Sequence, residues 1–448
     1  MTWAPGLLLR VLACLGLAAL VYAWAPPPDG TRTGLALFAL IGSLWMTQAL
    51  HLSVTALLVP LLAVLTGLMD VRPALAAFAH PIIFVFLGGF ALAAALHQQG
   101  LDHRLAAAVL KLAAGRRTTA VALLFGLSAL LSMWISNTAT AAMMLPLALG
   151  LLHDDDGPAE RAFVLLGVAY SASIGGIGTL VGSPPNAIAA AQAGIGFAQW
   201  MAFGVPMVLA LLPLMAGTLY LVLRPRLGGR THVVPPSPRT EPLNRGQRLT
   251  LAVFACTAAG WVGSAPLGRL LGISADLDSV VAIAAIVALV ATGVITWPQI
   301  EKNTHWGVLL LFGGGLALSE VMATSGASRF LASGLTTTLQ QAPTLVLLLG
   351  VVAFVVFLTE LVSNTASAAL LVPIFMGVAL ALDVPPPLFA AAIAVSASCA
   401  FMLPVATPPN AIVFATEQVP QATMMRCGLV LNAVCILVIA AMAQWVFL

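Results

Sequence analysis

Ser136-Asn137-Thr138-Ala139-Thr140 is followed, ten residues after Ser136, by Pro146. The cluster returns as Ser363-Asn364-Thr365-Ala366-Ser367, with Pro373 at the same spacing. The chain is 61% hydrophobic and 7% charged, and an unpaired polar group in hydrocarbon costs roughly 2–7 kcal/mol. Such groups are therefore expected to face a ligand, an ion or the protein interior. Close helix packing explains one copy equally well, but two equivalent copies favour a site built by an internal repeat.

Composition indicates a membrane protein with many helical crossings. The 448 residues carry 18 basic and 15 acidic side chains, and their mean hydropathy is +1.05. Several windows exceed the roughly 20 apolar residues that span a bilayer as a helix. Strand-length alternation typical of an outer-membrane barrel is not seen, so an all-α fold is expected. Residues 1–25 could pass for a signal peptide, but equally apolar segments follow, so we expect an uncleaved first helix.

The hydropathy pattern predicts eleven transmembrane helices and two hairpins that enter the membrane without crossing it. The first helix belongs to residues 1–32, an N-terminal repeat covers 33–223, a hydrophilic linker covers 224–248, and a C-terminal repeat covers 249–448. The re-entrant hairpins cover 118–150 and 343–382, each with a Ser-Asn-Thr cluster at its tip. The eleven transmembrane helices are expected at 7–24, 33–50, 52–69, 81–97, 162–193, 200–223, 249–262, 279–296, 307–324, 388–416 and 423–447.

Four features recur in the same order in both halves, at offsets of 224 to 227 residues. They are the Gly-Gly pairs at 88 and 314, the Ser-Asn-Thr clusters, the Ser-Ala-Ser triplets at 171 and 396, and the Pro-Pro-Asn-Ala-Ile runs at 184 and 408. Each repeat has five crossings, so the second enters the membrane inverted relative to the first. With a cytoplasmic N-terminus, fourteen of the 18 basic residues fall on the cytoplasmic side, which is the positive-inside asymmetry.

The Pro-Pro-Asn runs interrupt two long apolar segments, at 182–186 and at 406–410. Consecutive prolines remove backbone donors and leave carbonyls free in mid-membrane. Each break also starts a new half-helix, whose N–H groups and partial positive charge suit a carboxylate. Free carbonyls and Ser, Thr and Asn oxygens are the hard ligands that a small cation prefers. Because the tips and breaks contain no lysine or arginine, bound cations would lower the cost of holding a dianion there.

Other features have simpler explanations. The run Gly175-Gly176-Ile177-Gly178 is best explained by close helix packing, since no strand precedes it as a phosphate loop would require. Asp154-Asp155-Asp156 is most simply a solvated loop, and the seven histidines show no metal-ligand spacing. Glu320 and Glu360 lie in apolar segments, where they could serve cation or proton coupling, or sit near a segment end or pair with a neighbouring hydroxyl.

The paired Ser-Asn-Thr hairpins and Pro-Pro-Asn breaks resemble the divalent anion/sodium symporter family, which carries dicarboxylates, citrate and in some members sulfate. The resemblance implies homodimers and an elevator mechanism, in which the hairpins and neighbouring helices move as a rigid body. It implies one sodium site at Ser132, Ser136, Asn137 and Gly182, and a second at Thr359, Ser363, Asn364 and Ala406. It implies substrate contacts from Asn137, Thr138, Asn364, Thr365, Thr407 and Pro408. Ser183 departs from the family, which often has threonine there.

The sequence therefore predicts a secondary transporter of the cytoplasmic (inner) membrane. It would move C4 dicarboxylates such as succinate, malate or fumarate together with Na+. A sodium-independent dicarboxylate exchanger, and a citrate or sulfate transporter of the same fold, remain open. An intramembrane enzyme would need a nucleophile–base pair or a metal cluster, which the sequence does not show. A channel would need polar residues recurring along several helices, whereas here they cluster at four places.

Overall fold

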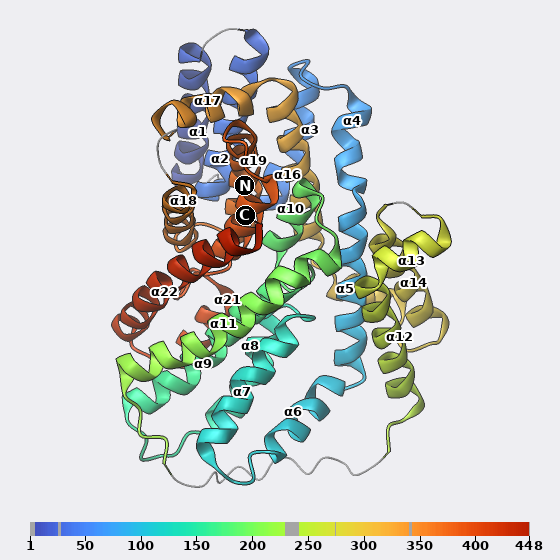
Figure 1. Ribbon diagram of the computed structural model, residues 1–448, viewed down its shortest axis with the longest axis vertical. Helices are drawn as coiled ribbons and strands as arrows, with labels where there is room; N and C mark the ends of the chain where they lie inside the picture. Colours follow the sequence, from blue (N-terminus) through green and yellow to red (C-terminus); the bar gives the residue numbers. More distant parts are fainter. Residues whose placement is uncertain (1–4, 26–27, 229–241, 274, 340–342, 448) are drawn as a thin grey trace.

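The computed structural model describes residues 5–25, 28–228, 242–273, 275–339 and 343–447. Every regular element in those ranges is an α-helix or a short 3-10 helix (Figure 1). Within them, seven helices are long and apolar enough to cross a membrane, or eight if the bent pair Arg245–Val262 and Ser264–Leu271 forms one span. The expected all-α fold is therefore confirmed, whereas the count of eleven crossings stays a prediction.

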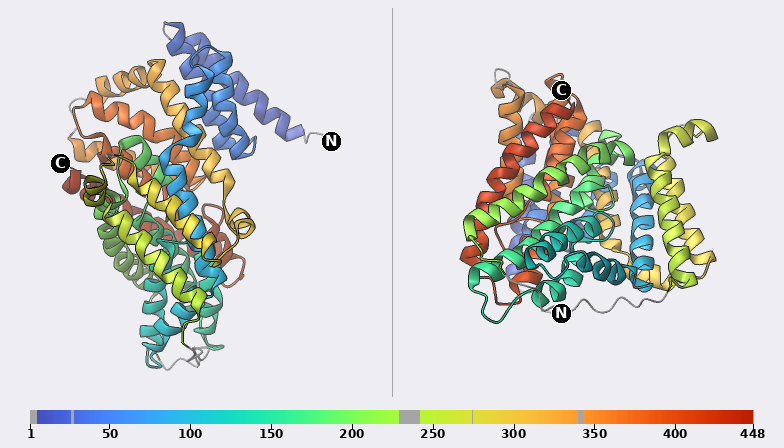
Figure 2. Two further views of the ribbon diagram at one scale, coloured as in Figure 1. Left: turned by 90° about the vertical axis from the view of Figure 1, so that its right-hand side faces the viewer. Right: turned by 60° about the horizontal axis from the view of Figure 1, so that its bottom comes forward.

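The first half of the chain runs from α1 to α11 and includes the 3-10 turns η1 and η2. The bounds are α1 Pro5–Trp24, α2 Asp29–Thr47, α3 Leu52–Leu65, α4 Val71–Ala76, η1 Ala77–Ala79, α5 Pro81–Gln98, α6 Leu101–Lys111, α7 Arg117–Ser132, α8 Asn137–Gly150, α9 Pro158–Gly175, η2 Gly176–Gly178, α10 Pro184–Ala193 and α11 Phe197–Leu223. Helix α1 packs against α2 at one edge of the molecule (Figure 2).

The second half of the chain runs from α12 to α22. The bounds are α12 Arg245–Val262, α13 Ser264–Leu271, α14 Leu277–Ala291, α15 Trp297–Asn303, α16 Trp306–Thr324, α17 Ala327–Leu339, α18 Thr344–Thr359, α19 Asn364–Ala381, α20 Pro386–Ala397, α21 Pro408–Phe414 and α22 Gln421–Phe447. Helices α12 to α14 lie beside α5, on the side away from α22 (Figures 1 and 2).

The two Gly-Gly pairs explain how helices α5 and α16 pack. A Cβ atom on Gly88 of α5 would lie 2.7 Å from the Cβ of Ala282 on α14. A Cβ atom on Gly314 of α16 would lie 2.6 Å from the Cβ of Ala56 on α3. Glycine at both positions lets each helix approach its partner closely, as small residues do in membrane proteins. Each half of the chain thus supplies a partner helix for the other.

At each predicted hairpin, two helices are joined by a short tip. Helix α7 ends at Ser132 and α8 begins at Asn137, while α18 ends at Thr359 and α19 begins at Asn364. Serine is a preferred residue before a helix because its oxygen can accept a bond from a free N–H group of the first turn. Ser136 does this, since its Oγ accepts from the backbone N–H of Ala139 at 3.2 Å.

The two long apolar segments are broken where the Pro-Pro-Asn runs stand. Helix α9 ends in the turn η2, and α10 starts at Pro184 with the two prolines in its first turn. Helix α20 ends at Ala397, and α21 starts at Pro408 in the same way. Proline fits the first helical turn because its missing N–H is not needed there.

Several expected boundaries differ from the structure. Helices α6 and α17, one before each hairpin, lie in stretches where no helix was expected, because charged and hydroxyl residues on one face hide an amphipathic helix from a hydropathy reading. The linker is shorter than predicted, since α12 already begins at Arg245, and its residues 229–241 lie outside the described residues.

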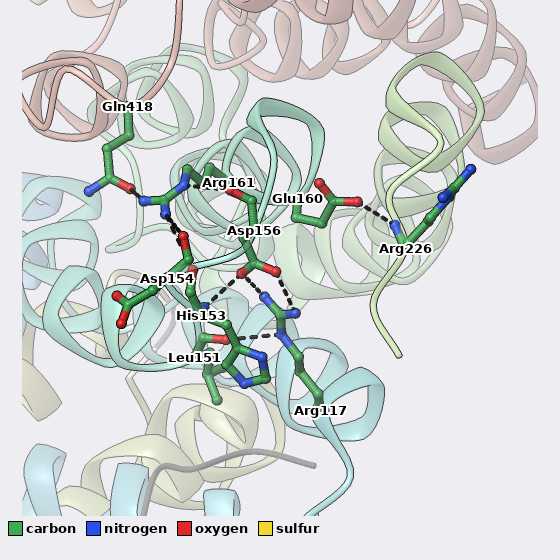
Figure 3. Close-up of polar contacts among 9 residues, drawn as sticks. All are labelled: Arg117, Leu151, His153, Asp154, Asp156, Glu160, Arg161, Arg226 and Gln418. Atoms are coloured by element: carbon green, nitrogen blue, oxygen red, sulfur yellow. Dashed lines mark hydrogen bonds and ion pairs between the residues drawn. The ribbon is translucent and has the colours of Figure 1, made fainter. Parts of the chain in front are cut away.

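The first hairpin is closed at its base by a buried ion pair (Figure 3). Both guanidinium nitrogens at the end of Arg117 donate to the carboxylate of Asp156, and its Nε donates to the carbonyl of Leu151 at 3.0 Å. The side chains of Arg117 and Asp156 are 2% and 6% exposed. The expectation that all three aspartates are solvated is therefore wrong for Asp156, because tertiary folding brings Arg117 to it.

Candidate functional site

Both hairpin tips and both helix breaks line one cavity of about 430 Å³. The tips contribute a hydroxyl and amide cluster each, and the breaks contribute backbone and prolines. These lining residues are Ser136, Asn137, Thr138, Ser363, Asn364 and Thr365 from the tips, with Gly182, Ser183, Pro184, Pro185, Ala406, Thr407, Pro408 and Pro409 from the breaks. Segments more than 200 residues apart in the sequence thus meet at one place.

The first tip is bonded directly to the first break through Asn137. Its side-chain amide nitrogen faces Ser132 Oγ at 2.6 Å and the carbonyl oxygens of Gly182 at 3.1 Å and Ala172 at 3.3 Å. A Cβ atom on Gly176 would lie only 2.4 Å from the Asn137 side chain. Glycine is therefore required at position 176 for this contact, which agrees with the packing role expected for the glycine run.

The second tip repeats this arrangement with threonine in place of serine. Thr359 Oγ1 lies 2.7 Å from Asn364 Oδ1 and 3.0 Å from the carbonyl oxygen of Ala397, where α20 ends. Thr359 is fully buried. Each hairpin thus holds its tip asparagine with the last hydroxyl residue of its first arm, and both tip asparagines line the cavity.

An asparagine fixes each break from within, a role that the sequence reasoning did not assign. Asn186 Nδ2 donates to the carbonyls of Gly176 at 2.9 Å and Thr179 at 2.7 Å. Asn410 Nδ2 donates to the carbonyls of Ala400 and Leu403, each at 3.0 Å. Both side chains are buried, and they satisfy carbonyls that the unwound backbone leaves without helical partners. The repeated third residue of Pro-Pro-Asn was the available signal.

Hydrogen bonds also join the region of the first break to the region of the second break. Ser183 Oγ lies 3.1 Å from Ser398 Oγ, and Tyr170 Oη donates to the carbonyl oxygen of Phe401 at 2.6 Å. These bonds join α9 and α10 of the first half to the end of α20 in the second. The unwound segments are therefore held by side chains of both halves.

Five helices begin at lining residues of the cavity: α3, α8, α10, α19 and α21. The free N–H groups at a helix start carry partial positive charge and favour anions. Among the described residues that line the cavity, no lysine, arginine, aspartate or glutamate occurs, and His305 is the titratable one. The cavity can therefore hold a small anion with amides, hydroxyls and helix ends, and its carbonyl and side-chain oxygens can take a hard cation.

The structure brings most of the residues named from the sequence to this cavity. All six named for substrate line it: Asn137, Thr138, Asn364, Thr365, Thr407 and Pro408. Among those named for sodium, Ser136, Gly182, Ser363 and Ala406 line it as well, whereas Ser132 and Thr359 lie buried behind the tips.

Further cavity residues were not singled out from the sequence. His305 and Trp134 line the cavity, and the His305 ring meets Phe90 edge-on with centroids 5.3 Å apart. The position of His305 just before α16 matches that of His80 before α5, so the repeat offered a signal for it. For Trp134 the sequence offered no signal other than its place within the first tip.

A larger cavity of about 840 Å³ lies elsewhere, between the start of α5, the α10–α11 joint and helices α13 and α14. Its lining includes Arg269, Asp276 and Asp278 and none of the tip residues. The paired motifs therefore belong to the smaller cavity.

Comparison with known proteins places the chain in a transporter family. The sequence model of the CitMHS family, described as citrate transporter, matches residues 43–390 and 279–448. An uncharacterized transporter of Haemophilus influenzae is 50% identical over 427 residues, which are 93% of this chain and 92% of that protein. The sodium-dependent dicarboxylate transporter SdcS of Staphylococcus aureus is 31% identical over 445 residues, covering 92% of this chain and 85% of that protein.

Two solved transporter structures share the fold. The YdaH transporter of Alcanivorax borkumensis is 17% identical, with a TM-score of 0.58 over 98% of this chain and 97% of that one. MtrF of Neisseria gonorrhoeae is 16% identical, with a TM-score of 0.61 over 100% of this chain and 96% of that one. The sequence matches and the shared fold lead to one conclusion: the chain is a multi-pass membrane transport protein that belongs to the CitMHS citrate transporter family, among the divalent anion/sodium symporters.

Proposed function

We propose that this protein is a secondary transporter that moves C4 dicarboxylates such as succinate, malate and fumarate together with Na+. The observation that carries the proposal is the meeting of two hairpin tips and two helix breaks around one cavity, whose described lining residues include no lysine or arginine. A dianion there would be held by amides, hydroxyls and helix ends, and sodium would offset its charge. The likeness to a sodium-dependent dicarboxylate transporter supports this choice.

We assign the dicarboxylate to the space between the tips, where Asn137, Thr138, Asn364 and Thr365 face the cavity together with Thr407 and Pro408 of the second break. The Thr407 hydroxyl already accepts from the backbone N–H of Asn410 at 3.3 Å, so it has a proton left to donate to a carboxylate.

We assign one sodium ion to each hairpin–break pair. The first site would use Ser132, Ser136, Asn137 and Gly182, and the second Thr359, Ser363, Asn364 and Ala406. Carbonyl, hydroxyl and amide oxygens suit a hard cation, and each set combines side chains of a tip with backbone of a break. The bonds of Ser132 and Thr359 to the tip asparagines would then be exchanged for bonds to the ion.

The proposed mechanism is an elevator in the cytoplasmic membrane, with the N-terminus inside and a homodimer as the assembly. In this proposal residues 33–223 and 249–448 are inverted repeats, and the hairpins are re-entrant. The matching order of α5–α11 and α16–α22 supports the repeats. The unequal share of basic residues on the two sides supports the orientation.

Counterflow in proteoliposomes tests the function. Vesicles preloaded with unlabelled succinate receive labelled succinate, in sodium or in choline. We expect accumulation with sodium and at least tenfold less with choline, because without bound sodium the dianion's charge is poorly offset. Equal accumulation in both salts would contradict coupling and identify a sodium-independent exchanger.

The family description favours citrate as a second candidate substrate. Competition with unlabelled citrate, succinate and sulfate in the same assay ranks the anions. Stronger competition by citrate than by succinate would assign the tricarboxylate, and stronger competition by sulfate would assign the inorganic dianion. The shared fold and the cavity would be unaffected by either outcome.

A further inference from the structure

A buried carboxylate, that of Glu360, binds the unwound backbone of the second break. Oε1 accepts from the backbone N–H groups of Phe401 at 2.7 Å and Met402 at 2.9 Å, and from Asn432 Nδ2 at 2.8 Å. Oε2 accepts from the backbone N–H of Leu403 at 3.0 Å. The residue is 4% exposed and follows Thr359 directly in the second tip. One side chain thus joins the second hairpin, the second break and α22.

The four partners suit the ionised form of this group. Every one of them is an N–H donor, and both oxygens of a carboxyl group accept without either donating only when the group has lost its proton. Charge-assisted bonds to backbone N–H groups are among the stronger protein hydrogen bonds, so they offset much of the cost of burial. Among the described residues, no lysine, arginine or histidine forms an ion pair with Glu360. The ionised form of Glu360 therefore has no cationic side chain in an ion pair to balance its charge.

Among the described residues of the first half, no carboxylate bonds the first break in this way. Met133 stands at the equivalent place, directly after Ser132, and its backbone carbonyl accepts from Thr179 Oγ1 at 2.5 Å. Thr179 Oγ1 in turn accepts from the backbone N–H of Gly182 at 3.2 Å. The first break is therefore tied to its hairpin by neutral groups, and the second by an anion. The two proposed sodium sites share a plan but differ in charge.

We propose that Glu360 is a positioning residue that holds the second break in place and, through its charge, gives the second sodium site the higher affinity. The inference rests on the proposed function. Glu360 adjoins Thr359 on one side of that site and holds residues 401–403, which lead into Ala406 on the other. A sodium ion bound between them would balance the carboxylate, whereas the first site has no equivalent charge.

The test compares Glu360→Gln with Glu360→Asp and with Glu320→Gln, since Glu320 is an exposed acid in another apolar helix. Each purified variant is assayed for sodium-dependent succinate uptake and for the rise in melting temperature that sodium gives over choline. We expect Glu360→Gln to raise the half-saturating sodium concentration about tenfold and Glu360→Asp about threefold, because only the first removes the charge. Glu320→Gln should match the wild type.

The outcomes separate the inference from the function it rests on. If the wild type responds to sodium and Glu360→Gln has an unchanged half-saturating concentration, the inference is overturned. Equal shifts in Glu360→Gln and Glu360→Asp would also overturn it, because geometry alone would then explain them. If Glu360→Gln does not fold, an unchanged value for Glu360→Asp decides against the inference. A wild type whose uptake and melting ignore sodium overturns the coupling itself.

Discussion

At the scale of single residues, the candidate site depends on positions where no side chain fits. Gly176 faces the Asn137 side chain, and a Cβ atom on Gly175 would lie 2.2 Å from the backbone oxygen of Ala129 on α7. These glycines let the first break press against the first hairpin. The position of Asn137 in the cavity therefore depends partly on two glycines that do not line the cavity.

Gly176→Ala is expected to lower succinate uptake at least tenfold, because the added methyl group displaces Asn137 from its partners. Gly126→Ala is the matched control, since a Cβ atom there has no heavy atom within 4 Å. It should leave uptake unchanged within about twofold and can stabilise α7, because alanine favours the helix. Initial rates in proteoliposomes, normalised to folded protein, measure both. Similar losses in the two variants would contradict the role of position 176.

At the scale of elements, the first hairpin is fixed at its tip and at its base. Arg117 starts α7, and Asp156 follows α8, so their ion pair joins the two ends of the hairpin (Figure 3). Burial by itself would raise the pKa of the Asp156 carboxyl. The hydrogen bond from Arg117, the bond from the His153 backbone N–H and the guanidinium charge outweigh it and hold that pKa below its ordinary value. Arg161 extends the network to Gln418 at 2.9 Å.

Asp156→Asn is expected to lower the free energy of unfolding by about 2 kcal/mol near neutral pH, between the values for surface and fully buried pairs. Because the folded pKa is lowered, the stabilisation is complete above about pH 4 and is lost as pH falls through the folded pKa. The melting-temperature difference between wild type and variant should therefore be constant from pH 5 to 8 and shrink toward pH 3.

Asp155→Asn is the control for this prediction, because Asp155 is an exposed neighbour in the same loop. It should melt within about 1 °C of the wild type, as surface substitutions change stability little. A difference for Asp156→Asn that grows as the pH falls would contradict the sign of the pKa shift.

At the scale of the whole molecule, one face of α5 meets the first break and another meets α14. A Cβ atom on Gly89 would lie 2.1 Å from Val181 Cγ1 in the first break, one residue after Gly88 meets α14. In α16, Gly315 faces Ala369 of α19 in the same manner, with 3.1 Å to its Cβ. In the proposed elevator, the hairpins and their neighbouring helices move as a rigid body. We infer that they slide past α5 and α16 at Gly89 and Gly315, where no side chain projects.

A Gly89→Cys, Val181→Cys double variant tests this motion in a background without the five native cysteines. Oxidation is expected to form a disulfide and to stop uptake, because the break can then no longer move along α5. Reduction should restore uptake, and sodium-dependent binding of succinate should persist in the oxidised protein. Full transport by the crosslinked protein would contradict sliding at this contact. The Val181→Cys single variant, treated with the same oxidant, controls for other damage.

The sequence by itself determined the all-α membrane class and the two helix breaks, and it named six residues that line the cavity. It could do so because polar clusters and paired prolines are compatible with few local structures in a chain surrounded by hydrocarbon. Both motifs also occur twice, which indicates an internal repeat. Only the tertiary structure decided that Asn186 and Asn410 bond the unwound carbonyls, that Asp156 is buried against Arg117, and that Glu360 binds residues 401–403. Those roles depend on partners brought together by folding, which local patterns do not encode.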